Sequence, residues 1–149
     1  MNREVIGKTY PPVSYEVCRE KIREYARATL QKNPLYTNPE FARSSSYGNI
    51  VAPPMFAAVY CGEIFNQVFF DKELGIHLPH IVHGEQEFVF VEVVRSGDVI
   101  TSVAQVVDVF SRESSTGGVN EFCVVKTESR NQNGELVSTG KWTVVERGI

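Results

Sequence analysis

The longest helical pattern in this chain closes the stretch of residues 33–70, which reads NPLYTNPEFARSSSYGNIVAPPMFAAVYCGEIFNQVFF. Pro53 and Pro54 suit the first positions of a helix, where a missing N–H group costs nothing. From Met55 onward, small and apolar side chains recur at three- and four-residue spacing, namely Ala58, Val59, Gly62, Phe65, Val68 and Phe69. We therefore predict a helix of about 16 residues, buried on nearly all sides and, at about 1.5 Å per residue, long enough to cross a sheet.

The sheet that covers this helix is predicted from the second half of the chain. Alternating β-branched and aromatic residues indicate four strands, at residues 81–94, 98–111, 119–130 and 136–146. Glycine-containing turns separate these four strands, at residues 96–98, 115–118 and 133–134. This order of strands and short turns predicts an antiparallel meander.

A short extended segment and an amphipathic helix are predicted before the central helix. Residues 8–13 read as extended, and Ser14 is the expected N-cap of a helix over residues 15–30. Together these elements predict an α+β fold of the hot-dog type, in which an antiparallel sheet wraps around one long helix, as a single domain over residues 1–149. Because such a sheet has open edges, we expect a dimer with the helices back to back and the sites between protomers.

Composition and charge exclude several classes of partner. Of the 149 residues, 42% are hydrophobic and 22% charged, as in a globular protein, and no apolar run is long enough to insert into a membrane. The formal net charge of −3 comes without a basic cluster, so a nucleic-acid partner is not expected. The N-terminal residues lack an apolar signal-peptide core, which predicts a cytoplasmic protein.

The cysteines and histidines do not predict a metal site. Cys18, Cys61 and Cys123 are odd in number and widely spaced, which favours reduced, packed thiols over a disulfide framework. The only closely spaced histidines have Pro79 among them, which breaks any helix, and no cysteine lies near them; they are His77, His80 and His83. We expect neither a metal nor a cofactor.

The loop over residues 31–49 is expected to be ordered. It contains Asn-Pro twice, and four apolar or aromatic residues interrupt its turn-forming residues: Leu35, Tyr36, Phe41 and Tyr47. An ordered loop of this length is usually functional.

Several motifs resemble one family over nearly the whole chain. NPLYTNPEFA, APPMF, VHGEQEF and VRSGDVI occur in the order found in MaoC-like (R)-specific hydratases and dehydratases, nearest their N-terminal, FAS1-like dehydratase branch. YEVCREKIREYA is similar to the first helix of substrate-binding subunits of mycobacterial (3R)-hydroxyacyl-carrier-protein dehydratases. The resemblance implies fatty-acid metabolism and the reversible addition of water across the C2=C3 bond of an enoyl thioester, carried by coenzyme A or by an acyl-carrier protein.

Three positions depart from the pattern of the active members, which carry Asp-x-Asn-Pro-Leu-His and a Gly at the helix start. Gln31 takes the place of the Asp, Tyr36 that of the His, and Pro54 that of the Gly. Gln does not titrate, Tyr has a reference pKa of about 10, and Pro has no N–H to donate. The resemblance therefore implies that this chain has no catalytic residues of its own in these positions.

In this family, a hot-dog domain or subunit without the catalytic residues pairs with one that has them. The space left at its vacated catalytic site holds the acyl chain. This implies a substrate-binding subunit with a hot-dog hetero-partner, or otherwise a homodimer, whose acyl tunnel is lined by Tyr36, Met55, Phe56, Val59 and Tyr60. Helical spacing also fits plain core positions for the last four of these. Gln31 also fits a residue that closes the end of the first helix.

Three other functions stay open at this point. One is a non-enzymatic homodimer that binds acyl thioesters, and another is a hot-dog thioesterase that uses Glu63, the only acid within the central helix. The third is an active hydratase that uses one of the three histidines instead. Acyl chain length and pathway are not encoded in any recognisable motif.

Overall fold

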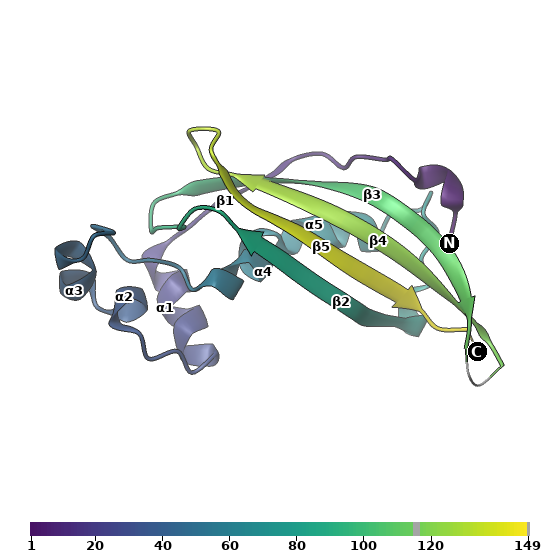
Figure 1. Cartoon of the computed structure of the whole chain (residues 1–149), viewed down its shortest axis with the longest axis horizontal. Helices are drawn as coiled ribbons and strands as arrows, with labels where there is room; N and C mark the ends of the chain where they lie inside the picture. Colours follow the sequence, from purple (N-terminus) through teal and green to yellow (C-terminus); the bar gives the residue numbers. More distant parts are fainter. Residues whose placement is uncertain (115–116, 149) are drawn as a thin grey trace.

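A computed structural model describes residues 1–114 and 117–148 of the chain (Figure 1). One antiparallel sheet curves over helices that lie on one of its faces. The strands are β1 (Val13–Glu16), β2 (Ile81–Phe90), β3 (Val99–Glu113), β4 (Val119–Arg130) and β5 (Leu136–Glu146). The helices are α1 (Arg19–Ala28), α2 (Pro34–Thr37), α3 (Pro39–Ser44), α4 (Ala57–Tyr60) and α5 (Gly62–Phe69), with 3-10 turns η1 (Arg3–Val5), η2 (Pro54–Phe56) and η3 (Leu78–His80). The predicted α+β hot-dog fold is confirmed.

The order of strands in the sheet is β1-β3-β4-β5-β2, so the predicted four-strand meander is only partly correct. β3, β4 and β5 follow one another as expected, but β2 pairs antiparallel with β5 at the far edge. β2 also ends at Phe90 rather than at residue 94, because the amides of Val91 and Glu92 both donate to the carbonyl of Val137 and the chain then leaves the sheet. One long edge of β2 has no strand beside it in the described chain.

The start of the first helix was predicted wrongly. Ser14 lies in β1, opposite Thr101 of β3, and their hydroxyl oxygens are 2.9 Å apart. The helix begins only at Arg19, after Cys18, which makes no side-chain cap. Pairing with β3 satisfies the backbone of these residues and brings Val17 into the core, and this tertiary gain outweighs the local helical pattern.

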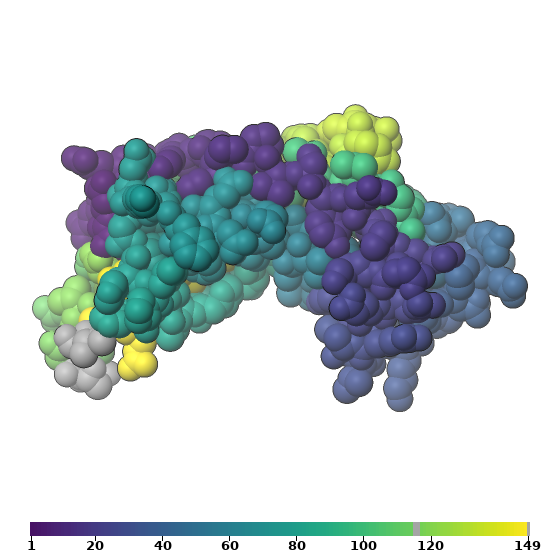
Figure 2. Space-filling model, turned by 180° about the vertical axis from the view of Figure 1, so that it is seen from behind, coloured from purple at the N-terminus to yellow at the C-terminus, as the bar shows by residue number. Residues whose placement is uncertain are grey.

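The central helix has about the predicted length, but it is interrupted and less buried than predicted. It consists of η2, α4 and α5, and Cys61 interrupts the α-helical run between the last two. One side is buried against the sheet, where Phe65 lies edge-on to Trp142 with ring centroids 4.7 Å apart. The other side is exposed in the single chain, at Met55, Ala58, Glu63, Asn66 and Phe70. The helix is therefore amphipathic, and Figure 2 shows it running along the open face of the molecule.

The three short helices α1, α2 and α3 form a lobe beyond one end of the sheet (Figure 1). A core cluster distinct from that under Trp142 joins this lobe to the sheet, and it includes Ile22, Ala42, Phe56 and Ile100. In Figure 2 a deep notch separates the lobe from the rest of the molecule. None of the helices described in residues 1–114 and 117–148 is long and apolar enough to cross a membrane.

Candidate functional site

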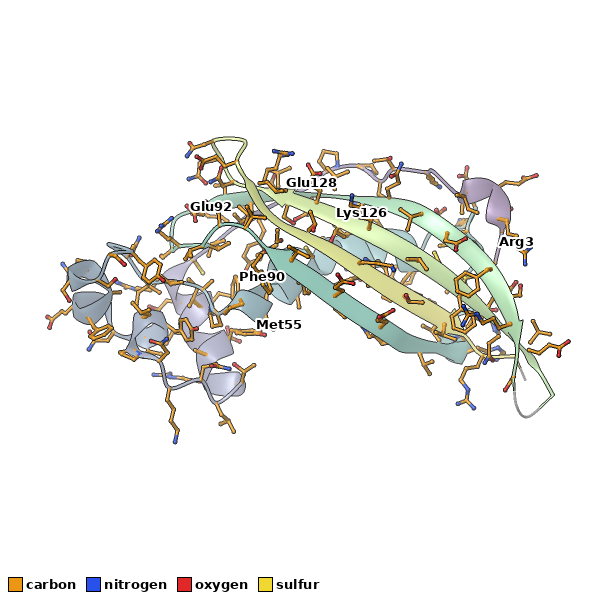
Figure 3. All side chains as sticks on the ribbon, viewed as in Figure 1. Arg3, Met55, Phe90, Glu92, Lys126 and Glu128 are labelled. Atoms are coloured by element: carbon orange, nitrogen blue, oxygen red, sulfur yellow. The ribbon has the colours of Figure 1, made fainter. Side chains whose placement is uncertain are left out.

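A cavity of about 350 Å³ lies where the lobe, the start of the central helix and the end of β2 meet. Figure 3 shows Phe90 and Glu92 on this side of the sheet, with Met55 at the nearby helix start. The lining residues come from the loop (Asn33, Leu35, Tyr36, Tyr47), the helix start (Val51, Ala52, Pro53, Pro54, Phe56, Tyr60), the end of β2 and the segment after it (Phe90, Val91, Glu92, Val93, Val94), and β5 (Val137).

The two Asn-Pro pairs build the loop wall of this pocket. Asn33 Oδ1 accepts a hydrogen bond of 3.0 Å from the Leu35 N–H and so caps α2, which begins at Pro34. Asn38 caps α3 in the same way, with Pro39 at its first position. These caps are encoded locally, and they turn Leu35 and Tyr36 toward the pocket.

The helix-start wall offers few hydrogen-bond donors. The Ala52 N–H donates to the carbonyl of Val94 at 2.8 Å, and Pro53 and Pro54 have no N–H at all. The N–H of Phe56 is also engaged, because it donates to the carbonyl of Pro53 at 2.8 Å. A substrate oxygen therefore finds no donor at residues 52–54.

The inner end of the pocket is closed by Phe56, Tyr60 and Val137, all of them buried. The Tyr60 hydroxyl lies 2.8 Å from Ser138 Oγ of β5. Burial raises the pKa of Tyr60 to about 12, and the hydrogen bond to Ser138 offsets this only in part. Tyr60 is therefore neutral at physiological pH and does not act as a base.

The structure brings together four of the seven positions singled out in the sequence. Tyr36, Pro54, Phe56 and Tyr60 line the pocket, and Tyr36 is half-buried there. The other three, Gln31, Met55 and Val59, do not line it. Gln31 is exposed, and its N–H closes the end of α1 by donating to the carbonyl of Ala26. Met55 lies on the exposed side of the central helix with 48% of its surface accessible, and Val59 packs against the lobe-side core.

The candidates for other chemistry lie away from this pocket. His77 and His80 sit before β2, at its opposite end, with their Nδ1 atoms 3.1 Å apart, and His83 is exposed on β2. No group of three or more His, Cys, Asp or Glu side chains in the described ranges is arranged to hold a metal. Glu63 lies on the exposed side of the central helix and is not among the pocket residues.

The three cysteines are free, as predicted, but only two of them are packed. Cys61 and Cys123 are buried, and burial raises the pKa of both thiols, that of Cys123 to about 12. Cys18 is exposed before α1, where the sequence had predicted a packed thiol. The prediction for Cys18 is wrong because the helix begins only at Arg19, so Cys18 precedes the helix instead of lying within it.

Most of the residues that line the pocket were not named from the sequence. Tyr47 lies in the loop that was predicted to be functional, and its aromatic character was a usable signal. The segment Phe90–Val94 and Val137 gave no such signal, because their relation to the loop depends on β2 lying next to β5. Among the lining residues Glu92 is the one carboxylate, and none is a histidine.

Comparisons with known proteins agree with the fold and the family. A model of the FAS1-like, dehydratase domain region family matches residues 4–140. A UPF0336 protein of Saccharopolyspora erythraea is 37% identical, and the match covers 99% of this chain and 92% of that protein. Another UPF0336 protein, from Streptomyces avermitilis, is 36% identical over 99% of this chain and 95% of its own length.

Two solved structures that resemble the chain are complexes. The HadBC (3R-hydroxyacyl-ACP dehydratase) complex from Mycobacterium tuberculosis is similar with a TM-score of 0.79 and 26% identity, covering 95% of this chain and 96% of that one. The ChsH1-ChsH2 complex from the same organism shares the fold, with a TM-score of 0.73 and 19% identity over 95% of this chain and 85% of that one. Because the family model spans nearly all of its length, this chain belongs to the family of FAS1-like dehydratase domains, which are MaoC-like hot-dog proteins.

Proposed function

We propose that this chain, acting as one hot-dog domain over residues 1–149, is the non-catalytic, substrate-binding subunit of a heteromeric (3R)-hydroxyacyl thioester dehydratase or enoyl-thioester hydratase. One observation carries the proposal. The loop and helix start that hold Asp, His and Gly in active members surround an apolar pocket here, with Tyr36 and Pro54 in its walls. The catalytic Asp and His would come from a partner hot-dog subunit.

The requirements of the hydration reaction explain why this pocket alone is insufficient for catalysis. Adding or removing water at C2 and C3 of a thioester requires a general acid/base, together with donors for the enolate oxygen as charge develops on it. Gln31 faces solvent and has no titratable group, Tyr36 stands where the active members have a histidine, and the prolines at 53 and 54 provide no donor. Glu92 lies on the pocket wall without a histidine beside it among the lining residues. The same walls can enclose an acyl chain, because most of the side chains that form them are apolar or aromatic.

Two unpartnered surfaces support a hot-dog partner. The free edge of β2 presents backbone groups without a neighbouring strand in the described sheet. The exposed side of the central helix carries Met55 and Phe70, of which 48% and 67% of the surface is accessible. A second hot-dog subunit that joins its own edge strand to β2 would cover both surfaces and would bring its catalytic loop to the junction.

The test is hydration of crotonyl-CoA by the purified chain, alone and after co-expression with a hot-dog subunit from a neighbouring gene that has the intact Asp-x-Asn-Pro-Leu-His loop. We expect turnover only in the mixture. Replacing the partner's His should lower kcat by about 10²–10⁴-fold, as for other general acid/base residues. Tyr36→Ala in this chain should instead raise KM with little change in kcat, because it removes binding rather than chemistry. Comparable turnover by this chain alone would refute the proposal.

A non-enzymatic homodimer that binds acyl thioesters is the second candidate. The unpaired edge of β2 is compatible with antiparallel pairing to a second copy of itself, which is the specific observation in its favour. Acyl-CoA binding by a homodimer, with no gain of hydratase activity from any co-expressed hot-dog subunit, would favour this candidate over the first. The thioesterase alternative has no such support, since Glu63 lies away from the pocket.

A further inference from the structure

The inner end of the pocket is a wall held in place by a buried hydrogen bond. Tyr60 belongs to both the pocket lining and the core, with only 2% of its surface accessible. Its hydroxyl group is bonded to Ser138 Oγ at 2.8 Å, and Ser138 is itself buried. The ring is therefore fixed at both ends, by the helix backbone and by β5, and it stands between the pocket and the interior of the sheet.

The space next to Ser138 on the inner face of the sheet is filled by polar side chains. Ser102, Ser129 and Ser138 occupy matching positions on β3, β4 and β5, and all three are buried. The hydroxyl oxygens of Ser102 and Ser129 lie 2.8 Å apart, and the thiol of Cys61, next to Tyr60 in the chain, lies 3.6 Å from Ser129 Oγ. This polar row lies across the sheet where the central helix is interrupted.

An apolar chain that extended beyond Tyr60 would enter this polar row. It would separate buried hydroxyl groups from their partners, and a buried polar group without a partner is strongly unfavourable. The pocket thus differs from the acyl tunnel expected from the sequence, because a tunnel would need an apolar continuation. The mouth can be extended by a partner subunit, but the inner end lies within this chain's own core.

The volume sets the scale of the ligand. At about 30 Å³ per non-hydrogen atom, the share of one water molecule in the liquid, a cavity of about 350 Å³ holds on the order of ten such atoms. Up to about eight carbons of an acyl chain, next to the thioester group, therefore fit within this chain's own part of the pocket.

From these observations we infer that the pocket is a closed-ended cleft for a short acyl chain, in which the Tyr60 ring is the floor and Ser138 is the residue that positions it. This inference rests on the proposed function and identifies the substrate class of the same site. Tyr60 sets the chain length at which contact with the floor begins, and Ser138 acts only through Tyr60.

The experiment measures the dissociation constants of the coenzyme A thioesters from butyryl to dodecanoyl, with the purified chain or with its hetero-complex. For the wild type, affinity should rise about fourfold per added methylene, the equivalent of ~0.8 kcal/mol of buried apolar surface, and should stop rising once the chain reaches Tyr60. We call the chain length at which the affinity stops rising the break. In Tyr60→Leu, which removes the ring, the break should move to an acyl chain that is longer by at least one methylene.

Three further variants distinguish an effect on the pocket floor from a general loss of stability. Tyr60→Phe and Ser138→Ala both remove the hydrogen bond but keep the ring, so both should give the same, smaller displacement of the break. Tyr10→Phe is the control, because Tyr10 is a buried tyrosine bonded to Asp71 and does not line the pocket. It should leave the break where it is. Circular dichroism and thermal unfolding first establish that each variant is folded.

The outcomes distinguish the floor from the proposed function. If the wild type binds the thioesters but its affinity keeps rising to dodecanoyl, or if folded Tyr60→Leu has its break where the wild type does, the closed floor is refuted and the substrate-binding role survives. If neither the wild type nor any variant binds any of the thioesters, the substrate-binding role and the floor are both refuted.

Discussion

Replacing Leu30 by Gly should stabilise the protein. Leu30 follows the last residues of α1 with φ of 56°, the only non-glycine residue with positive φ in the described chain. Its N–H donates to the carbonyl of Arg27 at 3.1 Å, and the Gln31 N–H donates to that of Ala26 at 2.8 Å. These two bonds form a Schellman motif, in which the position of Leu30 is ordinarily taken by glycine.

The size of the effect follows from the backbone alone. A left-handed conformation costs a residue with a Cβ about 1–2 kcal/mol. Glycine avoids that cost but loses more conformational entropy on folding, about 0.5–1 kcal/mol. Leu30 is 83% exposed, so removing its side chain sacrifices little burial. We expect a net gain of about 0.5–1 kcal/mol, which for a chain of this length raises Tm by about 1–4 °C.

The assay is equilibrium unfolding in urea, followed by circular dichroism and checked by calorimetry. Leu30→Ala is the matched control, because alanine keeps the Cβ and therefore the strain, and its stability should stay within about 0.5 kcal/mol of the wild type. If Leu30→Gly is no more stable than Leu30→Ala, the assignment of strain to this turn is wrong.

Two further predictions concern the sheet and its pH dependence. Gly140→Ala should destabilise the fold by about 1–3 kcal/mol, because a Cβ there would lie 2.5 Å from Thr127 Oγ1 and 3.0 Å from the Phe88 ring. Gly62→Ala, with no atom within 4 Å of its new Cβ, is the control that should not be destabilised in the same unfolding assay. Burial acts to raise the pKa of Asp71, but hydrogen bonds from Lys8, Tyr10 and the Glu73 N–H outweigh it and lower that pKa. The ionised Asp71 therefore stabilises the fold fully above the ordinary carboxyl pKa of about 3.9, and this stabilisation is lost as the pH falls through the lower pKa of the folded state. The difference in unfolding free energy between wild type and Asp71→Asn should accordingly narrow below about pH 4. A constant difference down to pH 2 would contradict this.

Features encoded over a few neighbouring residues were recognisable without the structure. The β4 and β5 bounds agree with the predicted strands, because alternation and glycine-containing turns act over short distances. The Asn-Pro pairs that start α2 and α3 are equally local, since each asparagine caps its own helix, but they were interpreted as turns of an ordered loop and the two short helices were missed. Trp142 lies on the inner face of β5, one of the predicted strands, and is buried there, because a large apolar side chain on that face has no other favourable place.

Features that depend on distant residues required the tertiary structure. Residues 13–16 became a strand because β3 offered them backbone partners, and no local pattern could outweigh that. Only part of the pocket was recognised. Tyr36, Pro54, Phe56 and Tyr60 lie in one stretch of sequence, whereas Phe90–Val94 and Val137 join them only when β2 pairs with β5. The hydrogen bond from Tyr60 to Ser138 spans 78 residues. Local chemistry thus determined β4 and β5 and underlies the prediction that catalytic groups are missing, and the pairing of distant strands decided which residues complete the pocket.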